Sequence, residues 1–188
     1  MLALQGDFLE HQQVLGRLAV DSCQVRNAIE LNDLNGLIIP GGESTVIGKL
    51  AKDFDLLEPL RQFAREHAVW GTCAGSIFLS KDARRDQPLL GMMDITVARN
   101  AFGRQVDSFE VDLVIPALKS ESGENPPFHA IFIRAPLIDS VGEGVEVISS
   151  LPDGRIVAAR QGHWLATAFH PELSGDDRLH GYFLEMIQ

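Results

Sequence analysis

The chain is organised around the stretch Val69-Trp70-Gly71-Thr72-Cys73-Ala74-Gly75-Ser76, in which a short apolar run breaks into a glycine-flanked cysteine. This order predicts a strand, a sharp turn that carries Cys73, and the start of a helix. Small residues two positions before and two after a nucleophile let the backbone turn sharply and expose the reactive atom. The N–H groups of a helix that begins at Ala74 favour the thiolate form of the cysteine. The alternative is a structural role, since an unpaired cysteine often packs as a small hydrophobic side chain.

Strands and helices alternate on the N-terminal side of this stretch. Apolar runs predict strands at residues 2–4, 22–25 and 36–40, and amphipathic spacing predicts helices at 8–19, from Ser44 onward, and at 56–66. This alternation is typical of a parallel sheet covered by helices on both faces, with ligands at the carboxyl ends of its strands. Gly41 and Gly42 follow one such strand. Either their N–H groups contribute to an oxyanion hole, or the two glycines form a plain turn between strand and helix.

The C-terminal half is less regular. We expect strands at 95–98, 106–114, 130–134, 145–149, 156–160 and 164–169, an exposed loop at 119–127 and a final helix at 176–187. Arg99 and Arg134 stand at strand ends. An arginine there either is solvated or binds a carboxylate, and the pattern alone leaves both open.

A reactive cysteine needs a base, and His170 is the candidate. It follows a predicted strand and precedes Pro171 and Glu172; in an extended segment, residues two apart project to the same side. We therefore expect Cys73 as nucleophile, His170 as base, and Glu172 as the carboxylate that orients the base. No role is assigned to the other histidines, which are His11, His67, His129, His163 and His180. No metal site is expected, because His170 and Glu172 offer too few ligands.

Length and composition predict one domain, residues 1–188. With 16 Lys and Arg against 26 Asp and Glu, the net charge of −10 argues against nucleic-acid binding, which needs clustered positive charge. Two cysteines, of which Cys23 is given no role, favour a reducing compartment. No apolar run is long enough to span a membrane, so a cytoplasmic location is expected.

Several motifs resemble those of class I (triad) glutamine amidotransferases, and more narrowly those of the glutaminase subunits of pyridoxal 5'-phosphate synthase. The motifs are Pro40-Gly41-Gly42-Glu43-Ser44-Thr45, Gly71-Thr72-Cys73-Ala74-Gly75, Arg99-Asn100-Ala101-Phe102-Gly103-Arg104-Gln105, Phe132-Ile133-Arg134-Ala135-Pro136 and Phe169-His170-Pro171-Glu172-Leu173. The resemblance covers nearly the whole chain. It implies an α/β fold of the class I glutamine amidotransferase (flavodoxin-like) type, a three-layer sandwich with a central, mostly parallel sheet.

The resemblance also implies an activity: hydrolysis of L-glutamine to L-glutamate and ammonia through a thioester on Cys73. It assigns the oxyanion hole to Gly42 and Ala74, and a position near the oxyanion loop and the synthase contact to Gln5. The residues implied to hold glutamine are Gly42, Glu43, Ser44, Arg99, Ile133 and Arg134. The implied partner is a barrel-shaped synthase subunit in a large hetero-oligomer that receives the ammonia. No cofactor is implied, because pyridoxal 5'-phosphate is the product of that complex.

The sequence departs from the family pattern in four places. Relatives usually begin a few residues earlier, so a clipped first strand is expected; Ser76 replaces an aliphatic residue, Ala98 an acidic one, and the loop at 120–127 looks enlarged. Two alternatives remain open. One is another triad amidohydrolase, such as one acting on gamma-glutamyl peptides, and the other is an inactive scaffold partner.

Overall fold

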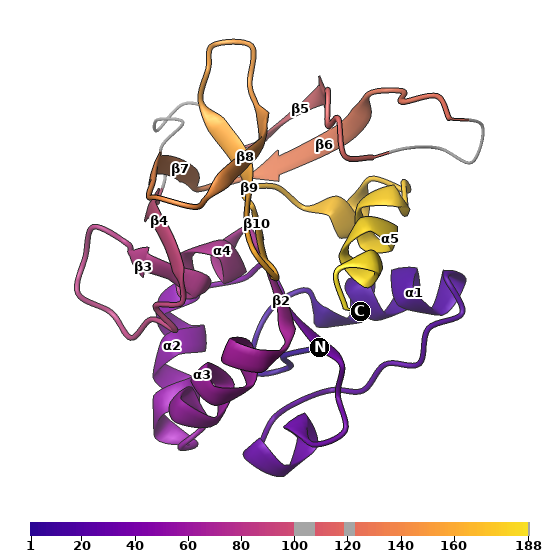
Figure 1. Ribbon diagram of the computed structural model, residues 1–188. Helices are drawn as coiled ribbons and strands as arrows, with labels where there is room; N and C mark the ends of the chain where they lie inside the picture. The colour runs from indigo at the N-terminus through magenta and orange to yellow at the C-terminus, as the bar shows by residue number, and fades with distance from the viewer. Residues whose placement is uncertain (100–107, 119–122, 188) are drawn as a thin grey trace.

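The computed structural model describes residues 1–99, 108–118 and 123–187, and in these it shows a central sheet between two layers of helices (Figure 1). Helices α2, α3 and α4 cover one face, and α1 and α5 cover the other. The helices are α1 (Phe8–Arg17), α2 (Ser44–Asp53), α3 (Leu57–Glu66), α4 (Ala74–Leu79) and α5 (Arg178–Glu185), with short 3-10 turns η1 (Ala28–Leu31) and η2 (Pro171–Leu173). The three-layer α/β fold class is thereby confirmed.

Within the described residues the main sheet has eight strands, in the order β1-β2-β10-β9-β7-β4-β3, with β8 paired to β9. The strands are β1 (Gly36–Ile39), β2 (Ala68–Thr72), β3 (Ser80–Asp82), β4 (Met93–Ala98), β7 (Leu137–Val141), β8 (Glu146–Ser150), β9 (Ile156–Gln161) and β10 (Trp164–Thr167). A separate hairpin pairs β5 (Ser108–Leu113) with β6 (Phe128–Ile133). Strands β3 and β7 were not expected from the sequence. Residues 100–107, which hold most of the arginine motif and the start of the strand expected at 106–114, lie outside the described part, as do residues 119–122 of the expected loop.

The sheet is mixed, whereas the sequence led us to expect mostly parallel pairing. Strands β1, β2 and β10 pair in parallel, as do β3 and β4. Strand β9 is antiparallel to β10, β8 and β7, and β7 is antiparallel to β4. The connections give the physical reason for part of this pattern: α2 and α3 return the chain from β1 to the parallel strand β2, while short turns reverse it between β8 and β9 and between β9 and β10.

The first predicted strand forms only an isolated bridge. Leu2 pairs with Val25 in parallel, and the N–H of Leu2 donates to the carbonyl of Ile38 at 2.9 Å. The segment at residues 1–3 therefore lies between Val25 and β1 and continues the sheet beyond its edge. It ends beside the pocket described below, because residues 5–7 follow directly.

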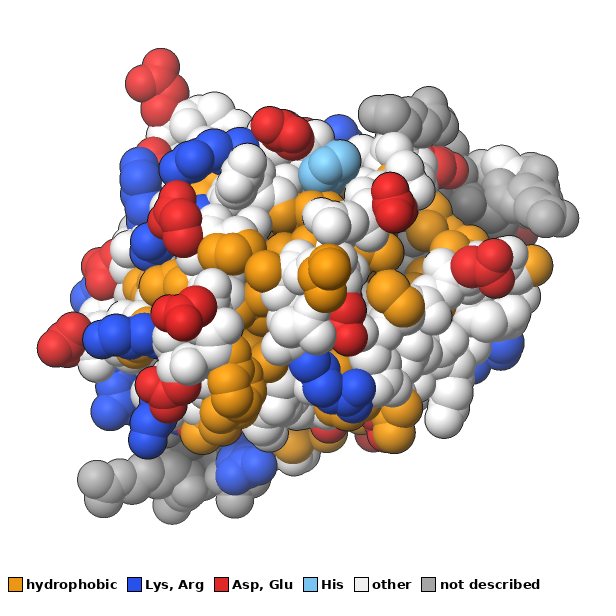
Figure 2. Space-filling view, turned by 90° about the horizontal axis from the view of Figure 1, so that it is seen from below, with side chains coloured by type: hydrophobic (Ala, Val, Ile, Leu, Met, Phe, Trp, Pro, Cys, Tyr) orange, Lys and Arg blue, Asp and Glu red, His pale blue; other side chains and the backbone are white. Residues whose placement is uncertain are grey.

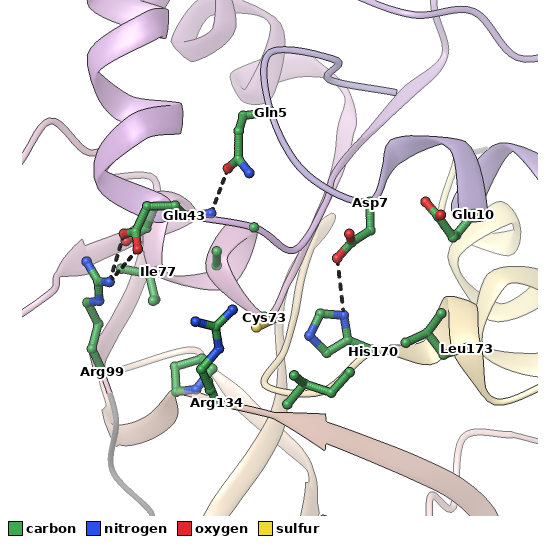
Figure 3. Close-up of a pocket in the computed structure, with 15 residues that line it drawn as sticks. Gln5, Asp7, Glu10, Glu43, Cys73, Ile77, Arg99, Arg134, His170 and Leu173 are labelled. Atoms are coloured by element: carbon green, nitrogen blue, oxygen red, sulfur yellow. Dashed lines mark hydrogen bonds and ion pairs between the residues drawn. The ribbon is translucent and has the colours of Figure 1, made fainter. Parts of the chain in front are cut away.

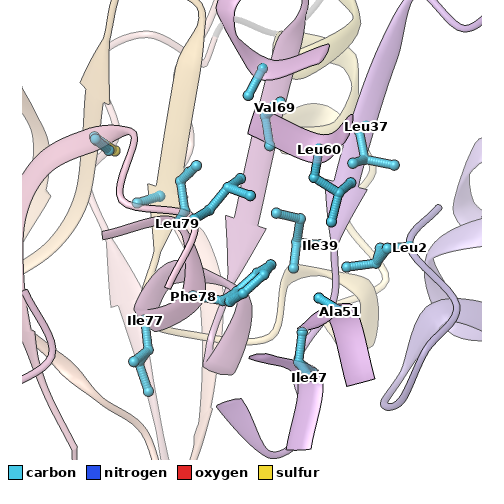
Figure 4. Packing of buried hydrophobic residues seen from close by; sticks show 14 of the residues in the cluster. Leu2, Leu37, Ile39, Ile47, Ala51, Leu60, Val69, Ile77, Phe78 and Leu79 are labelled. Carbon is cyan, nitrogen blue, oxygen red and sulfur yellow. The ribbon is translucent and has the colours of Figure 1, made fainter. Parts of the chain in front are cut away.

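Alternating side chains on the central strands divide the core in two. On β1 and β2, Leu37, Ile39 and Val69 pack towards the layer of α2, α3 and α4, as Figure 4 shows. Ile38 and Trp70 point to the other face, where they join the cluster with α1 and α5. This period of two, on strands buried on both faces, decides which of the two helical layers each side chain packs against.

The surface carries both signs of charge. On the face in Figure 2, acidic and basic side chains are interspersed, with hydrophobic side chains between them. Among the described residues, no helix has the length and apolar character needed to cross a membrane.

Helix α4 lies unusually close to β1 because Gly75 has no side chain. A Cβ built on Gly75 would lie 2.0 Å from the carbonyl oxygen of Ile39 and 3.0 Å from that of Pro40. Both contacts are with backbone atoms, which cannot rotate away. Only glycine at position 75 therefore allows the turn at Cys73 to pack this closely against the neighbouring strand.

We expect Gly75→Ala to lower the melting temperature by more than about 5 °C or to prevent folding, since the added methyl must displace β1 from α4. Thermal unfolding followed by circular dichroism measures this. The matched control is Gly16→Ala in α1, where the new Cβ meets no atom within 4 Å. Alanine is the better helix former, so the control should melt at or above the wild-type temperature. Equal melting temperatures for the two variants would contradict the packing argument.

Candidate active site

Cys73 occupies the sharp turn between β2 and α4. Its backbone has φ 45° and ψ −109°, which is a strained conformation for a residue with a side chain. The turn is held from both sides: the N–H of Cys73 donates to the carbonyl of Thr167 at 2.8 Å, and the hydroxyl of Ser76 donates to the carbonyl of Cys73 at 2.6 Å. A Cβ on Gly71 would lie 2.4 Å from the carbonyl oxygen of Gly75. This is the geometry expected of a nucleophile elbow.

His170 comes to Cys73 from the far end of the sequence. It follows β10 and immediately precedes η2, and its N–H donates to the carbonyl of Ile131 at 2.8 Å. Its Nδ1 donates to Oε1 of Glu172 at 2.7 Å, inside the protein. The expected contact is present, but the reason given for it is wrong: the chain from Pro171 on is a 3-10 turn, not an extended segment.

The electrostatics of this group favour a charged imidazole. Burial lowers the pKa of His170, but hydrogen bonds with Cys73 and Glu172 outweigh that effect and raise the pKa to about 10. Burial raises the pKa of Glu172, and the hydrogen bond with His170 opposes this. An imidazolium next to the sulfur stabilises a thiolate, which is the nucleophilic form of cysteine.

A pocket of about 440 Å³ opens above Cys73 and His170, and Figure 3 shows its lining. Every residue predicted for the site lines this pocket except Glu172, which lies behind His170. The predicted residues in the lining are Gln5, Gly42, Glu43, Ser44, Cys73, Ala74, Arg99, Ile133, Arg134 and His170. Residues distant in the sequence thus meet at one edge of the sheet.

Opposite charges are paired in the wall of the pocket. Arg99 forms an ion pair with Glu43, with Nη2 2.7 Å from Oε1 and 2.9 Å from Oε2. Burial raises the pKa of Glu43, but hydrogen bonds with Thr45 and Arg99 outweigh it and lower the pKa. The guanidinium of Arg134 points into the pocket near Cys73 (Figure 3). The pocket therefore offers cationic groups for a carboxylate and an anionic group for an ammonium.

The loop that carries the two predicted glycines is bonded to the N-terminal segment. The N–H of Glu43 donates to Oε1 of Gln5 at 2.6 Å, and the N–H of Asp7 donates to the carbonyl of Gly41 at 3.1 Å. A Cβ on Gly42 would lie 2.5 Å from Oε1 of Gln5. The shape of this loop thus depends on residues 5–7.

Two residues near the reactive group were missed in the sequence. Oδ2 of Asp7 lies 3.6 Å from Nδ1 of His170, and Nε2 of His11 lies 3.3 Å from Oε2 of Glu172. Asp7 is the N-cap residue of α1 and His11 lies in the first turn of that helix, and their positions in the sequence gave no signal of these contacts. Asp7, His170 and Glu172 also form a group whose ligand atoms lie within 4.8 Å of one another. Because Nδ1 of His170 already donates to Glu172, this group is better described as an imidazole paired with two carboxylates than as a metal site.

An α/β three-layer fold with a cysteine elbow facing a histidine and a buried glutamate defines the class I glutamine amidotransferase type of protein. A crystal structure described as a glutamine amidotransferase is similar, with a TM-score of 0.92 and 48% identity over 99% of this chain and 96% of that one. The chain belongs to the SNO glutamine amidotransferase family, whose model matches residues 1–188.

Relatives with a more specific name cover the same length. The pyridoxal 5'-phosphate synthase subunit PdxT of Herpetosiphon aurantiacus is 60% identical over 98% of this chain and 97% of its own. The protein of the same name from Moorella thermoacetica is 54% identical over 100% of this chain and 97% of its own. The resemblance read from the motifs is thereby confirmed.

The buried histidines behind the site predict sensitivity to acid. Burial lowers the pKa of His180 to about 4, although Asp177 opposes this, so the folded protein keeps the ring neutral while the unfolded chain protonates it near 6.5. Stability is therefore lost as the pH falls from about 6.5 to 4, by up to about 3 kcal/mol for this group. Urea unfolding between pH 7 and 4.5 measures the fall.

His180→Gln should make that fall shallower, because glutamine does not titrate. The matched control is His129→Gln on β6. His129 is exposed, and hydrogen bonds with Asp112 and Glu110 raise its pKa, so its removal should not flatten the loss in acid. An unchanged pH dependence in His180→Gln would contradict the assignment of a neutral buried ring.

Proposed function

We propose that this chain hydrolyses L-glutamine to L-glutamate and ammonia, and supplies the ammonia to a pyridoxal 5'-phosphate synthase partner. The observation that carries the proposal is the meeting of Cys73, His170 and Glu172 at one pocket with the Arg99–Glu43 pair in its wall. The names of the relatives, which are subunits of pyridoxal 5'-phosphate synthase, supply the pathway.

In the proposed reaction the thiolate of Cys73 attacks the side-chain amide carbon of glutamine. A C–S bond forms and the carbonyl π electrons move to oxygen, where backbone N–H groups near Gly42 and Ala74 stabilise the charge, an effect worth about 3 kcal/mol per donor. The intermediate collapses, the C–N bond breaks, and His170 gives its proton to the departing nitrogen, which leaves as ammonia. Water then attacks the thioester with His170 as base, releasing glutamate and the thiol.

The substrate's own charges fit the pocket. We propose that Arg99 and Arg134 bind the α-carboxylate, because guanidinium groups pair with carboxylates in a fixed geometry. Glu43 suits the α-ammonium, and the backbone and side chains around Gly42, Ser44 and Ile133 complete the contacts to glutamine. A volume of about 440 Å³ accommodates an amino acid of this size.

We further propose that docking of the synthase subunit acts on the oxyanion loop through Gln5. The support is the 2.6 Å bond from the N–H of Glu43 to the amide oxygen of Gln5, which ties loop geometry to the N-terminal segment. A large hetero-oligomer with a barrel-shaped synthase subunit, in the cytoplasm, belongs to the same proposal. The free thiols of Cys23 and Cys73 agree with a reducing compartment.

The proposal predicts that Cys73→Ser loses at least about a thousand-fold in glutamate release, because a hydroxyl is a far weaker nucleophile than a thiolate. The assay mixes the chain with a pyridoxal 5'-phosphate synthase subunit and measures glutamate formed from glutamine. Cys23→Ser is the matched control, since Cys23 is exposed and lies outside the pocket lining, and it should keep wild-type activity.

A wild-type complex that releases no glutamate would overturn the proposal and favour an inactive scaffold. Turnover of gamma-glutamyl peptides in place of glutamine would instead identify another amidohydrolase of the same class.

A further inference from the structure

The carboxylate of Glu172 has two oxygens, and the proposed triad uses only one. Oε1 accepts from His170 at 2.7 Å, while Oε2 is buried and has no well-aligned hydrogen bond from any described residue. Nε2 of His11 lies 3.3 Å from Oε2, with both side chains fully shielded from solvent. A buried carboxylate oxygen without a donor is costly, so the approach of His11 calls for an explanation.

His11 is itself held by a second buried histidine. Its Nδ1 lies 2.9 Å from Nε2 of His180, and its Nε2 lies 3.2 Å from the hydroxyl oxygen of Thr72. The rings of both histidines also contact the edge or face of Trp70. Four segments, α1, α5, β2 and η2, therefore meet at this point.

Burial keeps His11 neutral. Desolvation lowers the pKa of His11 well below 6.5, and the neighbouring His180 and His170 lower it further. Burial likewise lowers the pKa of His180 to about 4. The charged and titratable groups that face the pair are His170, Glu172, Asp177, Arg17 and the N-terminal ammonium group.

Two proton arrangements are possible for a neutral pair, and one of them fits. If Nδ1 of His11 donates to His180, the proton of His180 sits on its Nδ1, which is buried with no partner among the described residues. The lone pair on Nε2 of His11 would then face the carboxylate oxygen at 3.3 Å, acceptor against acceptor. This arrangement leaves one buried donor orphaned and places two acceptors in contact.

In the other arrangement Nε2 of His180 donates to Nδ1 of His11, and the N–H on Nε2 of His11 is shared between Thr72 and Oε2 of Glu172. The only group left without a partner is then an acceptor, which proteins tolerate better than an orphaned N–H. The contacts therefore favour a chain of donors that runs from His180 through His11 to Glu172.

We propose that His11 is a positioning residue for the Cys73–His170–Glu172 group, donating from Nε2 to the second oxygen of Glu172, with His180 fixing its tautomer. The inference rests on the proposed function of that group. Held at both oxygens, the carboxylate keeps its orientation and its negative charge, and so it stabilises the imidazolium of His170 and the thiolate beside it. A donor placed behind an orienting carboxylate acts on the reactive cysteine without touching substrate.

The test uses His11→Leu, which fills the space without polar atoms, and His11→Gln, which keeps both a donor and an acceptor. All variants carry Cys23→Ser, so that alkylation by iodoacetamide reports on Cys73 alone. In the isolated chain, we expect His11→Leu to move the pH midpoint of alkylation upward by about one unit, because the thiolate loses support. His11→Gln should stay within a few tenths of a unit of the parent.

In the complex with a synthase subunit, His11→Leu should lower kcat for glutamate release about ten-fold with KM within two-fold, since His11 does not line the pocket. The control is His163→Leu, which removes a histidine bonded to the carbonyl of Ala64, away from the site. It should leave both the alkylation midpoint and kcat unchanged. Should His11→Leu fail to fold, His11→Asn replaces it, because asparagine is too short to reach Glu172 and should show the same losses.

A wild-type midpoint in folded His11→Leu or His11→Asn would overturn the proposal. So would equal losses in His11→Leu and His11→Gln, which would indicate a packing role. The alkylation experiment needs no glutamine turnover. A complex without glutaminase activity, combined with the expected pH midpoints of Cys73 alkylation, would therefore contradict the proposed function and still support the positioning role of His11.

Discussion

The backbone turn at Cys73 is the constraint on which the rest of the site depends. A residue with a side chain at φ 45° is strained, and here the strain is borne by contacts that only glycine permits. Gly71 lies against the carbonyl of Gly75, and Gly75 lies against the carbonyl of Ile39, each too close for a Cβ. Because β1, β2 and α4 are locked together at this point, the sulfur is delivered to the same edge of the sheet as the loop after β1.

A second constraint is electrostatic. Glu172 and His170 are both buried, and a buried charge is stable only when it is paired and hydrogen-bonded. The pair at 2.7 Å satisfies each partner's charge, and Asp7 adds a second carboxylate at 3.6 Å from the same nitrogen. The fold thus stabilises the imidazolium of His170 beside the cysteine. The cost is the desolvation of two buried polar side chains.

The sequence predicted those parts of the fold that local chemistry decides. The elbow was predictable because glycines two positions before and after a cysteine indicate a sharp backbone turn. The strands at Gly36–Ile39 and Ala68–Thr72 were predictable because both of their faces are apolar. The resemblance gave Arg99 and Arg134 their place in the pocket, which the pattern at a strand end left open. The pairing of β7 with β4 and β9 was not predictable, because the sequence of a short strand with mixed faces does not indicate which strand it pairs with.

The contacts of His11 were hidden for a related reason. Its neighbours Thr72, Glu172 and His180 come from three other segments, and nothing within α1 distinguishes it from a histidine on a solvent-facing surface. The five remaining histidines were set aside together in the sequence, although two of them turn out to be fully buried and bonded to each other. When a residue's role depends on contacts with segments distant in the sequence, the burial of its side chain in the structure indicates that role, whereas the spacing of residues in the sequence does not.

One segment connects all three parts of the site. Gln5 bonds to the loop at Glu43, Asp7 approaches His170, and His11 approaches Glu172, all within seven residues that end in the first turns of α1. His11 lies in the first turn of α1, Asp7 is the N-cap residue of that helix, and Gln5 precedes Asp7 by two residues, so a displacement of the start of α1 moves the backbone that carries all three contacts. The loop after β1, His170 and Glu172 are therefore connected through residues 5–11 at the start of α1. Any event that shifts this helix acts on both the charge and the shape of the pocket.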